Sequence, residues 1–86
     1  MWSQLTSLPL TELAYGQIAT VSAVQAIATV DPIAERLRDL GFVAGEPVRI
    51  VARGPVGADP LLVQIGFTRF ALRRTEAARV LVEAAA

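Results

Sequence analysis

The side chains able to do chemistry are few in this sequence. Histidine and cysteine are both absent, which removes the imidazole base, the thiol nucleophile and the usual transition-metal ligands. Among the carboxylates, Asp31 and Glu35 stand one helical turn apart and would lie on one face of a helix. Such a pair could act as a general acid and a general base, or it could supply oxygen ligands to a divalent cation. Asp31 also precedes Pro32, and an aspartate there would cap the start of a helix.

We therefore predict no catalytic residue, no protein-held metal site and no cofactor. Weak surface binding of a divalent metal by carboxylates stays open. A nucleotide site is not predicted either, since neither GxxxxGK[ST] nor GxGxxG occurs. The stretch GPVG has a proline where a phosphate cradle would need an N–H donor. These observations predict a binding protein and not an enzyme.

The arginines are the more informative charged residues. All eight basic side chains are arginine, and eight carboxylates balance them, so the net charge exerts no general attraction on nucleic acid or an anionic membrane. Five of the arginines come from the predicted hairpin region: Arg49, Arg53, Arg69, Arg73 and Arg74. They have three interpretations, namely a face for single-stranded nucleic acid, a docking face for a protein, and an ordinary solvated surface.

Aromatic residues bear on that choice, because proteins that bind single strands stack bases on them. Phe67 and Phe70 flank Arg69, but a small core has to be filled, so we expect at least one of the two to be interior. We predict a protein-docking surface made of Arg49, Arg53, Arg69 and Arg73 beside Phe67, and no nucleic-acid partner.

The elements that position these residues follow from local patterns. Residues 18–24 alternate and are rich in β-branched side chains, which predicts a strand. Asp31 and Pro32 begin a helix whose apolar stripe is Ile33, Leu37 and Leu40. Gly41 ends that helix in the left-handed conformation, with Phe42 folding back onto the last turn.

Further strands are predicted at residues 48–53, 61–65, 70–73 and 80–83, with a short helical turn from Thr75 between the last two. Residues 54–60, GPVGADP, contain two glycines and two prolines and are predicted to form a loop. About five short strands with one inserted helix predict a mainly β fold, a small, partly open antiparallel barrel. A plain four- or five-stranded sheet packed under the helix is the alternative. We expect residues 1–86 to form a single domain.

Residues 36–83, from RLRDLGFVAG to ARVLVE, resemble the FeoA family, the small cytosolic component of bacterial ferrous iron uptake. The resemblance is carried by the helix-ending RL-x-x-LG, the glycine- and proline-bearing segment after Gly45, the D-P that begins the following strand, and A-L-R-R-x-E-A. The preceding SLPLTELAYGQIATV is similar to the family's opening. Family turns match Gly41, Gly45, Pro55, Gly57 and Pro60, and family core positions match Leu37, Leu40, Val48 and Ile50. Ala58 departs from the commoner loop pattern.

The resemblance implies an SH3-like barrel that acts as an adaptor. Its partner would be the ferrous iron permease FeoB, a membrane protein with a cytosolic GTPase portion, which the adaptor binds and modulates. A regulatory or nucleic-acid-binding module related to the C-terminal domains of iron-dependent repressors is the alternative function. We expect a cytoplasmic protein that meets the membrane only through the permease, since no apolar run approaches about 18 residues. A homodimer through an exposed edge strand stays open.

Overall fold

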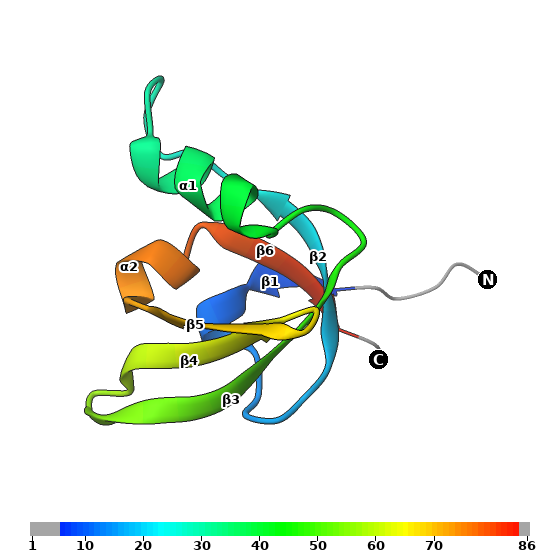
Figure 1. Ribbon diagram of the computed structural model, residues 1–86, viewed down its shortest axis with the longest axis vertical. Coiled ribbons are helices and arrows are strands. Elements are labelled where there is room, and N and C mark those ends of the chain that lie inside the picture. Colours follow the sequence, from blue (N-terminus) through cyan, green and yellow to red (C-terminus); the bar gives the residue numbers. More distant parts are fainter. Residues whose placement is uncertain (1–5, 85–86) are drawn as a thin grey trace.

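Six antiparallel strands form one sheet in the computed structural model, which describes residues 6–84 (Figure 1). The strands are β1 (Thr6–Pro9), β2 (Ala19–Val24), β3 (Pro47–Val56), β4 (Asp59–Ile65), β5 (Thr68–Leu72) and β6 (Val80–Ala84). Their order is β1-β6-β2-β3-β4-β5, so β1 and β5 form the edges of the sheet. The predicted mainly β, antiparallel fold is confirmed, with one strand more than expected. β1 was missed because four residues ending in Pro9 are too short to show a period of two.

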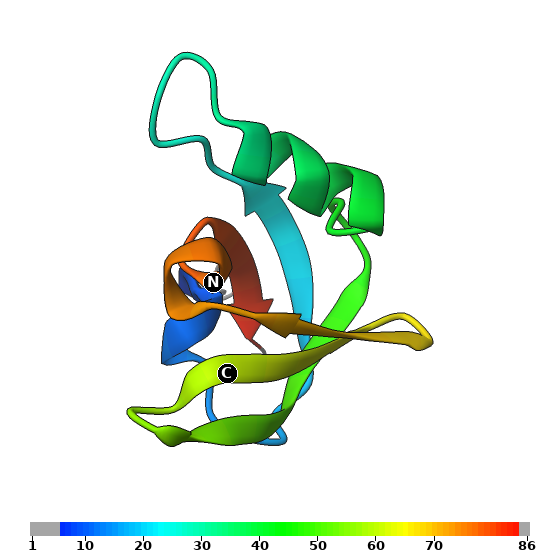
Figure 2. The ribbon, with the colours of Figure 1, turned by 60° about the vertical axis from the view of Figure 1, so that its left-hand side comes forward.

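The sheet curls around a single core, with the β3–β4 hairpin bending away from β1 and β6 (Figure 2). Val21, Ile50, Val63 and Val82, one from each of the four inner strands, expose at most 1% of their surface. Leu10, from a short 3-10 turn (η1, Leu10–Glu12), is also fully buried. The alternation predicted for the strands is what sends these side chains inward.

The inserted helix, α1 (Pro32–Leu40), begins and ends where the sequence predicts. The Asp31 carboxylate accepts hydrogen bonds from the backbone N–H groups of Ile33 and Ala34, both at 3.2 Å, as an N-cap does. Gly41 is left-handed, with φ 115°, and the N–H of Phe42 donates to the Leu37 carbonyl at 3.1 Å. Phe42 is thereby turned into the core, where it is 1% exposed.

The prediction of a loop over residues 54–60 is wrong. β3 runs to Val56 and β4 starts at Asp59, so the connection is only Gly57 and Ala58. Both have positive φ, 63° and 56°, the conformation that a two-residue type I′ hairpin turn requires. The two prolines of this segment are tolerated in strands because neither is a registered partner in the β3–β4 ladder, which is irregular there.

The last elements return the chain to the middle of the sheet. A short helix, α2 (Arg74–Ala77), follows β5 and leads into β6, which lies between β1 and β2. Phe70 of β5 turns inward and packs on Phe42 with ring centroids 6.1 Å apart, while Phe67 is fully exposed. Of the two phenylalanines, at least one of which was expected to be interior, Phe70 is half-buried against the core.

Candidate docking surface

Arg49 and Arg69 lie in one row across three strands, because both pair with Gln64 of the central strand β4. Neighbouring strands are about 4.8 Å apart, so roughly 10 Å separates the backbones of the two arginines. Gln64 Oε1 accepts a hydrogen bond from Arg69 Nε at 3.2 Å, and its Nε2 donates to the Gly66 carbonyl at 3.2 Å. Both ends of the amide are therefore occupied, which fixes the direction of Gln64 and of the Arg69 guanidinium.

A shallow groove runs beside this row. It is lined by Arg49 and Arg69 together with residues of β3, β4 and the segment before β2, namely Tyr15, Gly16, Ile50, Val51, Ala52 and Leu62. The guanidinium carbon of Arg53 lies 5.7 Å from the centre of the Tyr15 ring, in a cation–π contact that holds Arg53 at one side of the groove. We call Arg49, Arg53 and Arg69, with Gln64 and Tyr15, the arginine surface.

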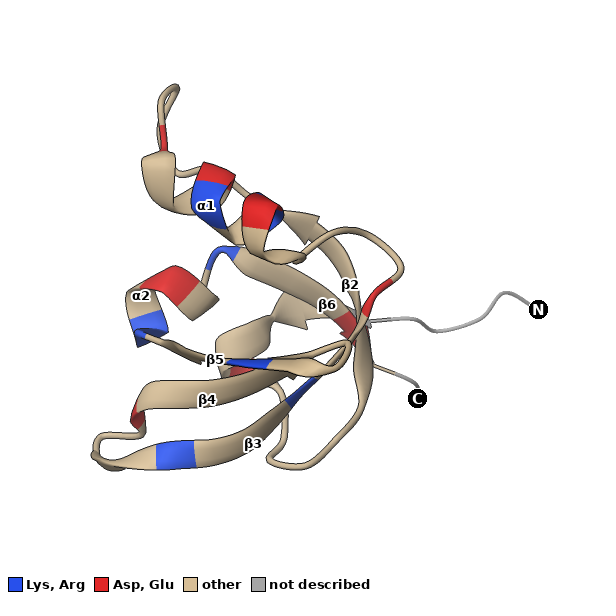
Figure 3. Ribbon diagram, viewed as in Figure 1, with Lys and Arg blue, Asp and Glu red and all other residues tan. Residues whose placement is uncertain are grey.

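None of the described residues that line this groove is a carboxylate. Within the described residues 6–84, none of the three arginines of the arginine surface forms a salt bridge. Figure 3 shows basic positions on β3 and β5, and both basic and acidic positions on α1 and α2, with one acidic position at the start of β4. The arginine surface is consequently a local positive region on a chain of zero net charge.

The other two predicted docking residues lie elsewhere. Arg73 follows the end of β5, where its backbone N–H donates to Glu76 Oε1 at 2.8 Å at the start of α2. Phe67 lies in the β4–β5 turn and lines a different groove, beside Leu40, Pro47 and Thr68. The structure thus brings Arg49 and Arg69 together, connects Arg53 to their groove only through Tyr15, and leaves Arg73 and Phe67 apart from them. The docking role of all five stays a prediction.

Sequence reasoning missed Gln64 and Tyr15. Gln64 is the polar residue between the buried Val63 and Ile65 on β4, so strand alternation alone points it to the outer face. That signal was present in the sequence. The contact between Tyr15 and Arg53 spans 38 residues of chain and had no local signal.

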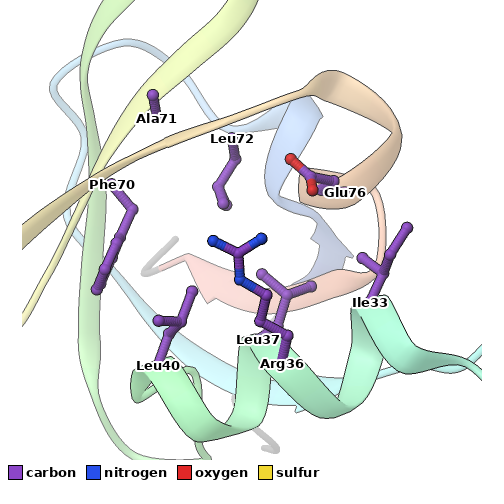
Figure 4. A pocket seen from close by; sticks show the side chains of 8 residues that line it. All are labelled: Ile33, Arg36, Leu37, Leu40, Phe70, Ala71, Leu72 and Glu76. Carbon is purple, nitrogen blue, oxygen red and sulfur yellow. The ribbon is translucent and has the colours of Figure 1, made fainter.

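A second cleft separates α1 from β5 (Figure 4). Its walls are apolar, with Ile33, Leu37 and Leu40 from the helix facing Phe70 and Leu72 from the strand. Arg36 extends across it from α1, and Glu76 lies at its α2 side (Figure 4). Most of the lining is thus apolar, and the charged residues Arg36 and Glu76 come from the two helices.

The carboxylate that the sequence singles out, Asp31, has a structural role. Besides capping α1 with its Oδ1, it accepts with Oδ2 from the Ile27 N–H at 3.1 Å and from Arg79 Nε at 2.8 Å. Arg79 also donates to the Thr75 carbonyl, which links α2 to the start of α1. The hydrogen bond from Arg79, followed by the one from Ile27, lowers the pKa of Asp31 from 3.8 to about 2.

This buried ion pair bears on metal binding. Four donors already occupy the two oxygens of Asp31, so a cation there would have to displace Arg79 from a site where both side chains are less than 10% exposed. The described part of the chain contains no group of three or more His, Cys, Asp or Glu side chains placed to hold a metal. The Asp31–Glu35 pair is therefore a capped helix start in this structure. Arg79, which completes the pair, was missed because it lies 48 residues from Asp31.

Comparison with known proteins identifies the family. The family model described as the FeoA domain matches residues 8–84, which is nearly the whole chain. The chain belongs to the FeoA family. Family membership associates it with ferrous iron transport and confirms the resemblance drawn from residues 36–83.

Solved structures of FeoA proteins agree with this fold. The FeoA of Stenotrophomonas maltophilia is 62% identical, with 85% of this chain and 86% of that chain covered and a TM-score of 0.79. It is described as a procaryotic SH3 domain protein, in complex with zinc, and as a candidate activating factor of bacterial ferrous iron transport. The FeoA of Chlorobium tepidum is 33% identical, covers 92% of this chain and 71% of that chain, and has a TM-score of 0.78. The fold is accordingly SH3-like, as predicted.

A likeness beyond the FeoA proteins concerns the fold alone. A manganese-dependent transcriptional repressor superposes with a TM-score of 0.76 over 94% of this chain and 43% of that chain, at 18% identity. No curated protein sequence matches the chain. None of the helices in residues 6–84 is long and apolar enough to cross a membrane.

Proposed function

We propose that this chain is a cytoplasmic adaptor of bacterial ferrous iron uptake. It binds the cytosolic GTPase portion of the ferrous iron permease FeoB and modulates its GTP turnover by contact, without chemistry of its own. Membership of the FeoA family supports the pathway, and the description of the Stenotrophomonas relative as an activating factor supports a modulating role. The membrane is reached only through the permease.

The observation that carries the proposal is the arginine surface. Arg49 and Arg69 line a groove in which no described residue is acidic, and Arg53 contacts Tyr15 of the same groove. None of the three guanidinium groups forms a salt bridge within the described residues. Complementary charge on a partner steers association and sets its orientation. Arg73 and Phe67 would contact the partner only at the margins, because they lie outside the groove.

Charge reversal tests the docking face. Arg49→Glu with Arg53→Glu should weaken binding of the FeoB GTPase domain in titration calorimetry and remove the salt dependence that wild type shows. For a matched control, Arg53→Glu alone is compared with Arg36→Glu, an equal change of charge on the exposed surface of α1. Equal affinity for wild type and the double variant would reject this face.

Modulation is tested separately. GTP turnover by the FeoB GTPase domain should change when the chain is added, and the double reversal should abolish the change. A turnover that does not respond to a saturating amount of the chain would leave binding without modulation and contradict this part of the proposal.

Two further expectations accompany the proposal. The chain holds no resident metal, and any divalent cation is bound weakly by surface carboxylates. Dimerisation would use an edge of the sheet, where β1 and β5 each have a strand on one side only in the described part of the chain.

A further inference from the structure

The arrangement of donors around Gln64 specifies the chemical group that the arginine surface receives. Resting on the proposed function, we infer that this surface recognises a carboxylate. An Asp or Glu side chain from an acidic segment of the partner lies between Arg49 and Arg69, with Gln64 as the residue that positions Arg69.

Arg69 is prepared for a two-point contact. Its Nε already donates to Gln64 Oε1, so its two terminal amino groups are the donors that remain for a ligand. A planar guanidinium matches the two oxygens of a carboxylate with parallel hydrogen bonds, and such charge-assisted pairs are about twice as strong as neutral ones. Because Gln64 is itself held by the Gly66 carbonyl, less side-chain freedom is lost when the ligand binds.

Arg53 lies beside the site and outside the row of Arg49 and Arg69. The register of β3 and β4 shifts between Ile50 and Ala52, so Arg53 pairs with Leu61, which is on the opposite face of β4 from Gln64. The contact of Arg53 with Tyr15 keeps the guanidinium near the groove in which Leu62 offers an apolar floor. The carboxylate site is therefore made by Arg49 and Arg69, and Arg53 beside Tyr15 is a further cation for a second acidic side chain of the same segment.

A phosphate group or a nucleic-acid strand fits this surface less well. Guanidinium groups bind phosphate as well as carboxylate, but many phosphate sites add a cluster of free backbone N–H groups, and the Gly16 N–H at the groove already donates to the Ile50 carbonyl at 3.0 Å. Single strands need aromatic faces for stacking, and the one aromatic side chain at the groove, Tyr15, already has Arg53 over one side of its ring among the described residues. Carboxylates need only the guanidinium donors that are present.

The test is an NMR titration of the ¹⁵N-labelled full chain at low salt. The probes are the blocked pentapeptide Glu-Gly-Gly-Gly-Glu, its control Gln-Gly-Gly-Gly-Gln, and inorganic phosphate. We expect the Glu peptide to shift the backbone amides of Arg49, Gln64 and Arg69 and the Nε–H of Arg69, with the Gln peptide at least tenfold weaker. No shift, equal shifts from both peptides, or tighter binding of phosphate at these signals would overturn the inference.

Two variants distinguish bidentate hydrogen bonding to a carboxylate from general attraction between opposite charges. Arg69→Lys keeps the charge but loses the planar fork, and Gln64→Leu keeps every charge but releases Arg69. Each should weaken binding of the Glu peptide severalfold, whereas Gln25→Leu, a change at an exposed residue away from the groove, should not. If Arg69→Lys and Gln64→Leu bind as wild type does, the surface attracts charge without reading a carboxylate and the inference is rejected.

The same variants keep this inference distinct from the proposed function. If the FeoB GTPase domain binds wild type and responds to the double reversal but ignores Gln64→Leu and Arg69→Lys, the adaptor role stands and carboxylate recognition fails. If the Glu peptide binds as expected and the GTPase domain does not, the carboxylate site stands and the proposed partner is wrong.

Discussion

Two glycines of this fold are required for different reasons, and the difference can be measured. Gly54 of β3 faces the backbone of β4. A Cβ atom added there would lie 2.6 Å from the Asp59 carbonyl carbon and 2.9 Å from the Pro60 nitrogen, where ordinary contacts begin at 3.4 Å. Gly41 has nothing within 4 Å of such an atom, but its φ of 115° is unfavourable for any residue with a side chain.

The cost of each Gly→Ala change follows from these geometries. In Gly54→Ala the two strands must separate by about 1 Å against backbone atoms that cannot rotate away, an overpacking that costs about 2 kcal/mol. At roughly 4–8 °C per kcal/mol for a domain of this size, the melting temperature should fall by about 8–16 °C. In Gly41→Ala the added Cβ meets no neighbour, and the left-handed backbone conformation alone is strained, which lowers the free energy of unfolding by about 1 kcal/mol.

Asparagine distinguishes the two mechanisms. It tolerates left-handed backbone better than alanine, so Gly41→Asn should be more stable than Gly41→Ala. At Gly54 the larger side chain meets the same backbone, so Gly54→Asn should be no more stable than Gly54→Ala. Thermal unfolding followed by circular dichroism gives all four melting temperatures. The reasoning is refuted if asparagine rescues position 54, or if Gly41→Ala loses more stability than Gly54→Ala.

Three other changes test the fold. Ala58→Asn should raise the free energy of unfolding in urea by about 0.5–1 kcal/mol, because asparagine relieves the positive φ in the hairpin turn; a lower value would contradict the type I′ assignment. Phe42→Ala should lower it by about 3–5 kcal/mol through the cavity left beside Phe70, and a loss under 1 kcal/mol would show that Phe42 is not packed there. Since the pKa of Asp31 falls from 3.8 to about 2 on folding, its ionised form stabilises the fold above about pH 4, and this contribution is lost as the pH drops toward 2. Asp31→Asn should flatten that part of the melting temperature plotted against pH, and an unchanged slope would remove Asp31 as its cause.

The features that the sequence predicted correctly are those decided by near neighbours. Asp31, Pro32 and Gly41 place both ends of α1, since capping depends on residues within one helical turn. Inward alternation likewise places Val63 and Ile65 in the core.

The sequence predictions fail where the local structure depends on contacts between distant parts of the chain. Residues 54–60 have the composition of a loop, but the left-handed Gly57 and Ala58 compress the turn and let both strands continue past their prolines. Arg79 carries no local sign of burial, and its pairing with Asp31 exists only because α2 packs near the start of α1. A single sequence gives no measure of such contacts.

Two polar residues, Asp31 and Gln64, have roles that differ from those their side-chain chemistry first indicates. Asp31 is the carboxylate that the sequence favours as a metal ligand. In the structure its oxygens accept hydrogen bonds from Arg79 and from three backbone N–H groups, so its role is to stabilise the fold. Gln64 is a neutral amide with no evident chemistry. It lies on β4 between Arg49 and Arg69, and its hydrogen bond orients the Arg69 guanidinium. A charged group satisfied within the protein has little left to offer a partner, whereas a neutral residue that orients an unpaired charge makes that charge selective. The case for docking at the arginine surface therefore depends on how its guanidinium groups are held as much as on their number.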